Sequence, residues 1–273
     1  MHLGLIVAGA IGQSLLTALD DDAHDVARLT ILCRPASAQA LRARLDGGGS
    51  LSRAAKIVTD AEALAGKDPD LVVECAGHSA VAAHVPTLLR AGIDVVLASV
   101  GSLADAGLEA TLRDAANTGN ARLILPAGAI GGIDVISALA LSGKPMQLHY
   151  RGIKPPAAWA GSPADTRLDL AALTAPTAHF SGSARQAAAA YPKNANVAAT
   201  LALAGPGLDD TTVELIADPE AGGNIHDYTV TTPDAQISMR IEGRPTEGNA
   251  RSSATTMWSL LREISNRSRA VVT

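Results

Sequence analysis

Aromatic residues are scarce in this sequence, with one Phe, two Trp and three Tyr among 273 residues. Proteins that bind RNA or single-stranded DNA stack bases on aromatic side chains, so this composition disfavours that class. Basic residues are also in the minority, with 22 Lys and Arg against 27 Asp and Glu and a net charge of −5. Duplex DNA attracts clustered positive charge. We therefore expect no nucleic-acid partner.

Cysteine is nearly absent as well, because Cys33 and Cys75 are the only two. They are too few for a disulfide framework and lack the spacing of metal ligands. The sequence contains neither an H-E-x-x-H motif nor a P-loop, so we expect no metal site and no phosphoryl transfer. No uninterrupted apolar run approaches the ~18 residues of a membrane span, and no signal-peptide pattern opens the chain. We expect a soluble, cytoplasmic protein without a membrane partner.

The first half of the chain alternates between short apolar runs and helical patterns. Such an alternation, with helical stretches of about 10–15 residues, indicates βαβ units. The apolar character of the runs suits parallel strands that are covered on both faces. We predict an α/β fold with a Rossmann-type, doubly wound parallel sheet. Its strands would come from residues 1–8, 29–33, 55–58, 71–75, 94–98 and 122–125.

After Pro126 the pattern changes, and Gly and Pro become more frequent. Residues 211–217 and 236–241 alternate between apolar and polar side chains, which is typical of antiparallel strands with one solvated face. Near the end of the chain, apolar residues recur every three or four positions and indicate a helix. We predict a dinucleotide-binding domain over residues 1–127, completed by a C-terminal helix over 246–273. Residues 128–245 would form a second α+β domain with a mixed or antiparallel sheet.

A glycine turn follows the first apolar run and opens the first helical pattern. In the G-x-G-x-x-G fingerprint, the second glycine lets the backbone approach the pyrophosphate, and the third lets helix and strand pack closely. Gly9 and Gly12 fill these two positions, whereas Val7 departs from the first. Free N–H groups at a helix start favour phosphate. We predict that Gly9, Ala10, Ile11 and Gly12 bind the cofactor; an ordinary strand–helix turn is the alternative.

The second apolar run ends in Cys33-Arg34-Pro35-Ala36-Ser37. An acidic residue that would hold the ribose 2′-hydroxyl of NAD is missing there. Arg34 instead offers a guanidinium to a 2′-phosphate, with Ser37 nearby. The alternative is an ordinary solvated arginine. We predict that Arg34 contacts the cofactor and that NADP is accepted alongside NAD.

Three further segments carry a family resemblance: Pro126-Ala127-Gly128-Ala129-Ile130-Gly131-Gly132-Ile133-Asp134, Tyr191-Pro192-Lys193-Asn194-Ala195-Asn196-Val197-Ala198-Ala199, and the stretch from Ala217 to Asn224-Ile225-His226. In this order of elements the chain resembles the L-aspartate dehydrogenase family over essentially its whole length. The second segment and the Asn-Ile-His motif are specific to that family. The glycine turn is shared with many dehydrogenases.

This resemblance implies reversible oxidation of L-aspartate with NAD or NADP to iminoaspartate. The imine would enter quinolinate and NAD synthesis, or be hydrolysed to oxaloacetate and ammonia. The resemblance also implies that His226 is the catalytic residue and that Ala129 and Asn196 line the nicotinamide side of the site. The family's homodimer, formed through the second domain, is implied as well.

Elementary chemistry agrees with a histidine at this position. Hydride leaves C2 of an amino acid only when the amine is neutral, so a group that titrates near neutral pH is useful. Asn224 and Asp227 flank His226, and either could orient its ring. The alternative is a surface histidine in a loop before an apolar strand. His78 is expected to border the cofactor at a strand end, and His179 has no pattern that indicates a role.

A dicarboxylate substrate needs cationic or N–H partners, and we predict Lys193 and Asn194. Asn194 and Asn196 share one side if the segment is extended; if a helix begins near Asn194, its free N–H groups could take a carboxylate. Arg151 and Lys154 precede two prolines and are weaker candidates for this role, because charges near a proline turn are usually surface features.

Two other functions stay open from the sequence. The first is a reductase of a small keto or imino acid, of the dihydrodipicolinate or homoserine type. The second is a non-catalytic dinucleotide sensor. Turnover with L-aspartate separates both from an aspartate dehydrogenase.

Overall fold

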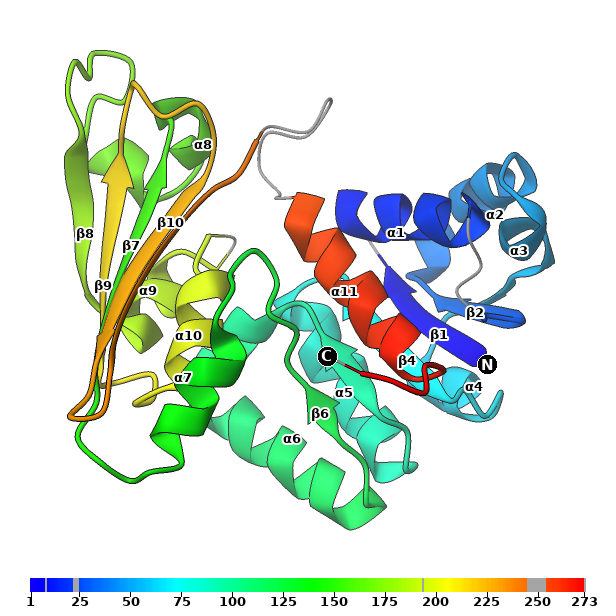
Figure 1. Ribbon diagram of the computed structural model, residues 1–273. Helices are drawn as coiled ribbons and strands as arrows, with labels where there is room; N and C mark the ends of the chain where they lie inside the picture. Colours follow the sequence, from blue (N-terminus) through cyan, green and yellow to red (C-terminus); the bar gives the residue numbers. More distant parts are fainter. Residues whose placement is uncertain (8, 22–24, 193, 245–253, 273) are drawn as a thin grey trace. The chain divides into compact units, whose positions relative to one another are not determined.

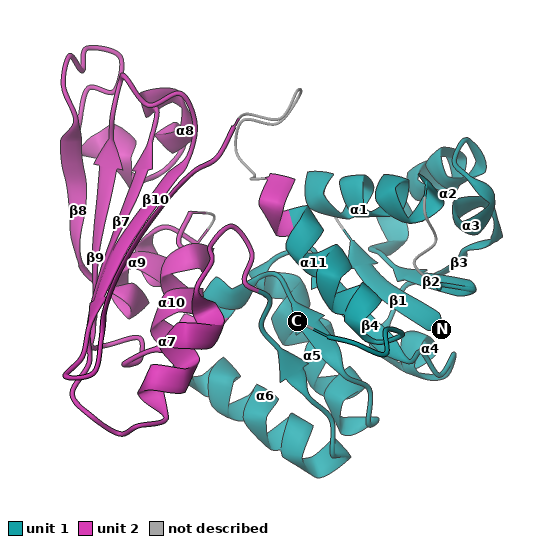
Figure 2. Ribbon diagram, viewed as in Figure 1, with its two compact units in different colours: residues 1–102, 106–126, 257–273 teal, residues 103–105, 127–256 magenta. Residues whose placement is uncertain are grey.

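The computed structural model describes residues 1–7, 9–21, 25–192, 194–244 and 254–272. The chain divides into two compact units, shown in different colours in Figure 2. The first unit contains residues 1–102, 106–126 and 257–273, and the second contains 103–105 and 127–256. The last segment of the chain therefore belongs with the first unit.

The first unit is built on a six-stranded sheet in the order β3-β2-β1-β4-β5-β6. All of its neighbouring strands pair in parallel. This is the doubly wound order of dinucleotide-binding folds, in which ligands bind where the order reverses, between β1 and β4. The predicted Rossmann-type sheet is confirmed. Its strands are β1 (His2–Val7), β2 (Arg28–Leu32), β3 (Lys56–Val58), β4 (Leu71–Cys75), β5 (Val95–Leu97) and β6 (Leu123–Ile124).

Helices connect these strands. Apolar side chains recur on one face of a connecting helix, and this face packs against the sheet. On α1, Leu15 and Leu19 are fully buried and pack in one core cluster with Leu3 and Leu5 of β1. The connecting helices of the unit are α1 (Ala10–Asp21), α2 (Ala38–Asp46), α3 (Ser50–Ala54), α4 (Ala61–Ala65), α5 (His78–Arg90) and α6 (Ala106–Gly119), with 3-10 turns η1 (Pro35–Ser37) and η2 (Val100–Ala104).

The C-terminal helix α11 (Ala254–Asn266) completes the first unit's core through Leu260, Leu261 and Ile264. The prediction of a helix over residues 246–273 was too long. After Asn266 the chain continues as turns, because the apolar periodicity ends there; residues 246–253 lie outside the described part. Arg267 holds this end by donating to the carboxylate of Asp94, 2.7 Å away.

The second unit contains a mixed sheet in the order β11-β10-β7-β9-β8. The predicted antiparallel character of residues 211–217 is half right, since β9 runs antiparallel to β8 but parallel to β7. The long connection between β7 and β9 includes helices, which a parallel crossover requires. The strands are β7 (Gln147–Lys154), β8 (Thr177–Ser183), β9 (Thr211–Ala217), β10 (Ile225–Thr231) and β11 (Gln236–Glu242).

The two faces of this sheet differ in chemistry. Figure 1 shows α7, α9 and α10 on one face, which we call the helix-covered face. The opposite face carries a ladder of charges, in which Arg151 lies 3.5 Å from Glu214 and 3.7 Å from Asp227. Because side chains alternate along a strand, the register decides which residues face the helices. The helices are α7 (Ile133–Ala140), α8 (Pro156–Trp159), α9 (Ala184–Ala190) and α10 (Asn196–Ala204), with the 3-10 turn η3 (Pro163–Thr166).

None of the helices in the described residues is both long enough and apolar enough to cross a membrane.

Candidate functional site

The predicted cofactor turn joins β1, which ends at Val7, to α1, which begins at Ala10. A Cβ added to Gly12 would lie 2.8 Å from Cγ1 of Val7, so this glycine allows α1 to pack closely on β1. A Cβ added to Gly9 would meet no described atom within 4 Å. Intramolecular packing thus explains Gly12 but not Gly9. Close approach of a ligand to the start of α1 is the physical reason left for a glycine at position 9.

A cavity of about 220 Å³ lies beside this turn, at the ends of β1 and β2. Gly9, Arg34 and Ser37 line it together, so the structure brings these predicted cofactor residues to one place. Arg44 of α2 also lines the cavity, and sequence reasoning missed it because it lies seven residues beyond the Arg34–Ser37 segment. Within the described residues, neither arginine forms an ion pair with a carboxylate. Their charge is therefore available to a phosphate group.

Glu74 organises the loop after β4, next to the same turn. It is fully buried, and its Oε1 accepts hydrogen bonds from the backbone of Ala76 (2.7 Å) and Gly77 (2.8 Å) and from the hydroxyl of Ser99 (3.0 Å). Burial raises the pKa of Glu74, although these bonds act against the shift. His78 begins α5 directly after this loop. The sequence signal for Glu74 was an acidic residue inside an apolar strand.

In the second unit, His226 is a buried residue of β10, with 5% of its surface exposed. The alternative of a surface loop histidine is wrong. Its Nδ1 lies 2.8 Å from the hydroxyl of Tyr150 on β7. Neither flanking residue orients the ring, because Asp227 points to the opposite face and pairs with Arg151. Asn224 precedes the strand, and its buried side-chain oxygen has no partner among the described residues.

Gly152 makes the contact between Tyr150 and His226 possible. It lies directly opposite His226 in the register of β7 and β10. A Cβ at position 152 would lie 2.9 Å from the hydroxyl of Tyr150. The missing side chain therefore leaves the space through which Tyr150 reaches the imidazole. Sequence reasoning could not find this pair, because Tyr150 and His226 are 76 positions apart.

His226 is a neutral imidazole at pH 7. Burial and the nearby charge of Lys154 lower its pKa to about 4. A tyrosine hydroxyl both donates and accepts hydrogen bonds, so it stabilises either neutral tautomer. When Nδ1–H donates to Tyr150, the lone pair of Nε2 is free to accept a proton. In this arrangement Nε2 is the atom of His226 that can take up a proton.

Lys154 lies on the helix-covered face with Tyr150 and is 95% removed from solvent. Its Nζ donates to Oδ1 of Asn194 at 2.8 Å and lies 5.0 Å from the ring centre of Trp159. The expectation of a surface lysine was wrong, because residues 150, 152 and 154 share the buried face. Burial lowers the pKa of Lys154 to about 8. The predicted substrate residue Lys193 lies outside the described residues, whereas its neighbour Asn194 contacts Lys154.

The other two predicted residues of this unit occupy loop–helix junctions. Asn196 begins α10, so the structure contains the helix rather than the extended alternative. Ala129 is buried in the segment before α7. The carbonyl of Gly131 in that segment accepts a 2.9 Å hydrogen bond from the hydroxyl of Tyr228. This bond holds the segment against β10, two residues from His226.

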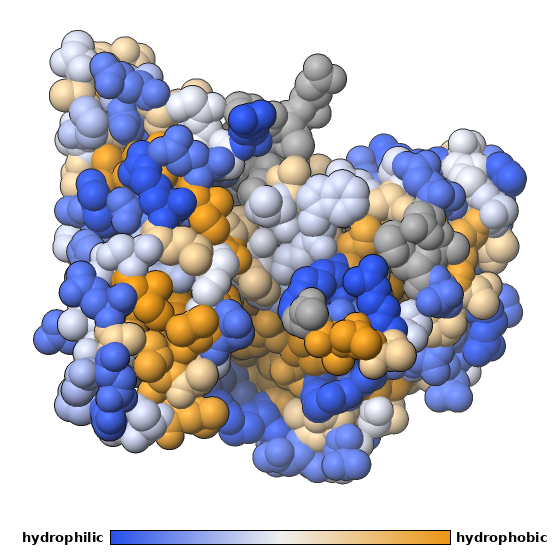
Figure 3. Space-filling model, in the orientation of Figure 1, coloured by the Kyte–Doolittle hydropathy of each residue, from blue (hydrophilic) through white to orange (hydrophobic). Residues whose placement is uncertain are grey.

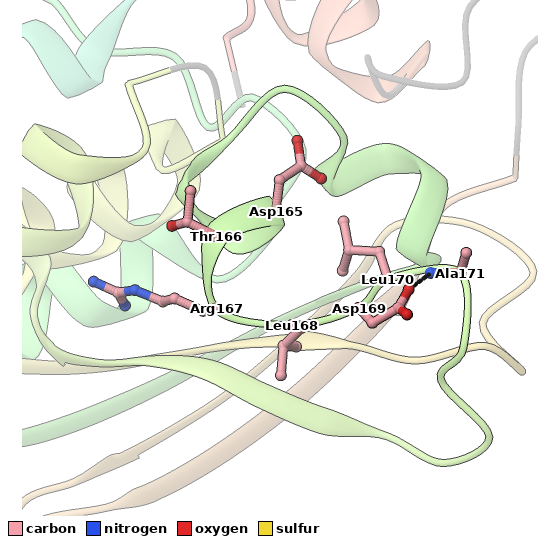
Figure 4. A pocket seen from close by; sticks show the side chains of 7 residues that line it. All are labelled: Asp165, Thr166, Arg167, Leu168, Asp169, Leu170 and Ala171. Carbon is pink, nitrogen blue, oxygen red and sulfur yellow. Dashed lines mark hydrogen bonds between the residues drawn. The ribbon is translucent and has the colours of Figure 1, made fainter.

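A second hollow of about 650 Å³ is formed by the loop 165–171 alone, shown in Figure 4. Asp169 in that loop bonds to the backbone of Ala171. None of the predicted site residues lines it. Arg167 also donates to the carbonyl of His179 at 2.7 Å. His179 is buried edge-on against Trp159, with ring centres 4.4 Å apart.

Comparisons with known proteins agree with the two-unit architecture. A family model described as aspartate dehydrogenase, C-terminal, matches residues 134–267, and the NAD binding domain of homoserine dehydrogenase matches residues 8–126. An L-aspartate dehydrogenase of Ruegeria pomeroyi is 50% identical over 88% of this chain and 84% of its own. One of Polaromonas sp. is 42% identical over 100% of this chain and 99% of its own.

The chain belongs to the L-aspartate dehydrogenase family. The predicted family resemblance is thereby confirmed. The crystal structure of aspartate dehydrogenase from Thermotoga maritima has the same fold, with a TM-score of 0.77, 24% identity, and coverage of 100% of this chain and 99% of that one. Within the described residues of this family member, no group of three or more His, Cys, Asp or Glu is placed to hold a metal ion.

The two glycines of the cofactor turn should respond differently to alanine. We expect Gly12→Ala to lower the free energy of unfolding by about 1–3 kcal/mol, since its Cβ overlaps Val7. Gly9→Ala should leave the melting temperature unchanged and raise the Kd for NADPH, measured by fluorescence titration. Equal effects of both substitutions on melting, or unchanged NADPH binding by Gly9→Ala, would contradict this assignment.

Proposed function

We propose that this protein oxidises L-aspartate with NAD or NADP to iminoaspartate. The observation that carries the proposal is the buried His226, held neutral beside a buried lysine, in a member of this family. The first unit would bind the dinucleotide at Gly9, Ala10, Ile11, Gly12 and Arg34. The second unit would bind the amino acid.

The proposed chemistry needs one proton acceptor and one hydride acceptor. The nicotinamide ring, when bound, supplies the second by taking hydride from C2 of the substrate. Nε2 of His226 takes a proton from the substrate ammonium, so that the nitrogen lone pair can form the C=N bond. Tyr150 holds the imidazole through Nδ1 during this transfer. The products are iminoaspartate in its protonated (iminium) form, the reduced cofactor and the proton held by His226.

The same residue serves the later steps. After His226 has released the first proton to solvent, the neutral imidazole can accept a proton from the water that attacks the imine, which yields oxaloacetate and ammonia. Unhydrolysed imine would be available to quinolinate and NAD synthesis. The proposed reaction is reversible, because the reduced cofactor and the imine restore the substrate when the proton returns.

The two other functions suggested by the sequence are less favoured. The homoserine-type match covers only the dinucleotide-binding residues 8–126, whereas the match over 134–267 is to aspartate dehydrogenases. A sensor needs no buried base, yet His226 is buried and hydrogen-bonded.

The proposal also includes a cytoplasmic homodimer that forms through the second unit. Apolar side chains exposed on and after α7 support self-association, since Val135 is 46% and Leu141 90% exposed. Figure 3 shows the corresponding apolar patch over α7. We also propose that Ala129 and Asn196 lie beside the nicotinamide ring of the bound cofactor.

Replacement of the proposed base should abolish turnover but not cofactor binding. We expect His226→Ala to lower kcat for L-aspartate by about 10²–10⁴, with the Kd for NADPH unchanged. His149→Ala is the matched control, because His149 is an exposed histidine of the neighbouring strand β7. Its kcat should equal that of the wild type. Wild-type turnover by His226→Ala, or no turnover of L-aspartate by the wild type, would refute the proposal.

Loss of the Tyr150 hydroxyl should act through the imidazole. Tyr150→Phe leaves Nδ1 of His226 without its buried hydrogen-bond partner. We expect kcat to fall about 10–100-fold, which is the range for loss of a residue that orients a metal-ligating histidine through a hydrogen bond. The ¹⁵N shifts of His226 should show a changed tautomer population. An unchanged tautomer population together with an unchanged kcat would show that Tyr150 is only a packing residue.

Arg34 should distinguish the two cofactors. We expect wild-type kcat/KM values for NADP and NAD to be comparable. Arg34→Gln should lower the NADP value by about 10–150-fold, as for loss of a charged hydrogen bond of about 1.5–3 kcal/mol, and leave the NAD value unchanged. Arg113→Gln, on α6 and paired with Glu109, is the control. Complete rejection of NADP by the wild type would contradict this role.

A further inference from the structure

We propose that Lys154 binds a carboxylate group of the dicarboxylic substrate and is the principal cationic residue of the substrate site in the second unit. This inference rests on the proposed function and deepens it. The residue lies at the end of β7, on the same face of the sheet as Tyr150 and His226.

The first observation is a buried cation without a counter-ion. Lys154 is 5% exposed, and no carboxylate of the described residues lies within 4.0 Å of its Nζ. An ammonium group has three hydrogen-bond donors, and the structure shows one of them bonded to Asn194. Among the described residues the other two donors have no hydrogen-bond partner, so they can serve a ligand.

The second observation is the charge of the surroundings. The groups that face Lys154 come from four elements or loops and are neutral: the ring of Trp159, the amide of Asn194, His179 and His226. Burial is the main reason that the pKa of each histidine is about 4. The positive charge of Lys154 adds to the shift of His226, and the charges of Arg167 and then Lys154 add to the shift of His179. An anion is the ligand that such a cluster stabilises.

The third observation is the contrast with another lysine of the same unit. Lys144 is half exposed, and its Nζ lies 2.6 Å from the carboxylate of Asp234. At that position the lysine pairs with a carboxylate of the chain. An uncompensated buried charge costs several kcal/mol, so the fold does not gain stability from Lys154 as it stands. The presence of such a residue in a buried position points to a role in binding.

Lys154 is a cation rather than the base of the reaction at neutral pH. Its pKa of about 8 leaves the amine mostly protonated at pH 7. A substrate carboxylate beside it would cancel much of the positive charge that acts on His226. The imidazole would then accept the substrate's proton more readily than in the free protein. Binding of the correct substrate thus prepares the base.

The kinetic test compares Lys154→Met, Lys154→Arg and the control Lys144→Met. We expect Lys154→Met to raise the KM for L-aspartate by at least about 30-fold, the lower end for loss of one partner of a buried charge pair. Lys154→Arg should recover part of the loss, and Lys144→Met should equal the wild type. The Kd for NADPH should be the same in all four proteins. An unchanged KM in Lys154→Met overturns the proposal.

A second measurement does not depend on turnover. Succinate has both carboxylates of the substrate and no amine, and we expect calorimetry to show that it binds the wild type and not Lys154→Met. Above pH 8, binding should take up protons, measured by comparing buffers of different ionisation enthalpy. If L-aspartate is not oxidised but succinate still binds through Lys154, the proposed function fails and this inference stands. Equal succinate binding by Lys154→Met and the wild type overturns the inference.

Thermal melting separates binding from a structural role. A buried cation without a partner destabilises the folded state, so Lys154→Met should melt at or above the wild-type temperature. The folded state prefers the neutral amine, because its pKa is below that of an unfolded lysine. The wild type should therefore gain stability relative to Lys154→Met as the pH rises from 8 to about 10.5. A lower melting temperature in both Lys154→Met and Lys154→Arg would show a structural role and overturn the inference.

Discussion

The register between β7 and β10 is the constraint on which the second unit's candidate site depends. It sets Gly152 opposite His226 and Tyr150 opposite Tyr228, so that one face carries the imidazole, its tyrosine partner and Lys154. The next residues along, Arg151 and Asp227, pair on the opposite face. A shift of one residue would exchange the two sets, placing the charge ladder under the helices and the imidazole in solvent. The ion pairs of the outer face thus help to specify the chemistry of the inner one.

Burial sets the protonation states of the ionisable residues on this face and lowers the stability of the folded protein. The folded state holds His226 and His179 neutral at pH values where the unfolded chain would protonate them, so their contribution to stability is complete above about pH 6.5 and is lost as the pH falls toward 4. Lys154 stays charged at neutral pH without a carboxylate of the described residues beside it. In the first unit the buried side chain of Glu74, by contrast, accepts hydrogen bonds from backbone N–H groups and from Ser99.

The sequence was sufficient for the features that local patterns encode. The apolar runs and intervening helices predicted the parallel sheet, because strands covered on both faces must be apolar throughout. The spacing of Gly9 and Gly12 predicted the strand–helix turn, and the position of Arg34 after β2 placed it beside Gly9 in one cavity. The likeness in three short segments identified the family over the whole chain. Each of these conclusions rests on neighbours within a few tens of residues.

Contacts between distant strands were beyond such patterns. Nothing near His226 indicates that Tyr150 is its partner, since the pairing follows from a register set by the whole sheet. Lys154 was misplaced for a related reason. Its two following prolines favour a turn, but Lys154 is the last residue of strand β7, and helix α8 begins two residues later. Because side chains alternate along the strand, the lysine points to the buried face. A charged residue at a strand end is therefore buried or exposed depending on a shift of one position along the strand. Lys154 is buried because it lies on the same face as Tyr150 and Gly152, and which face is buried becomes clear only from the pairing with the neighbouring strand.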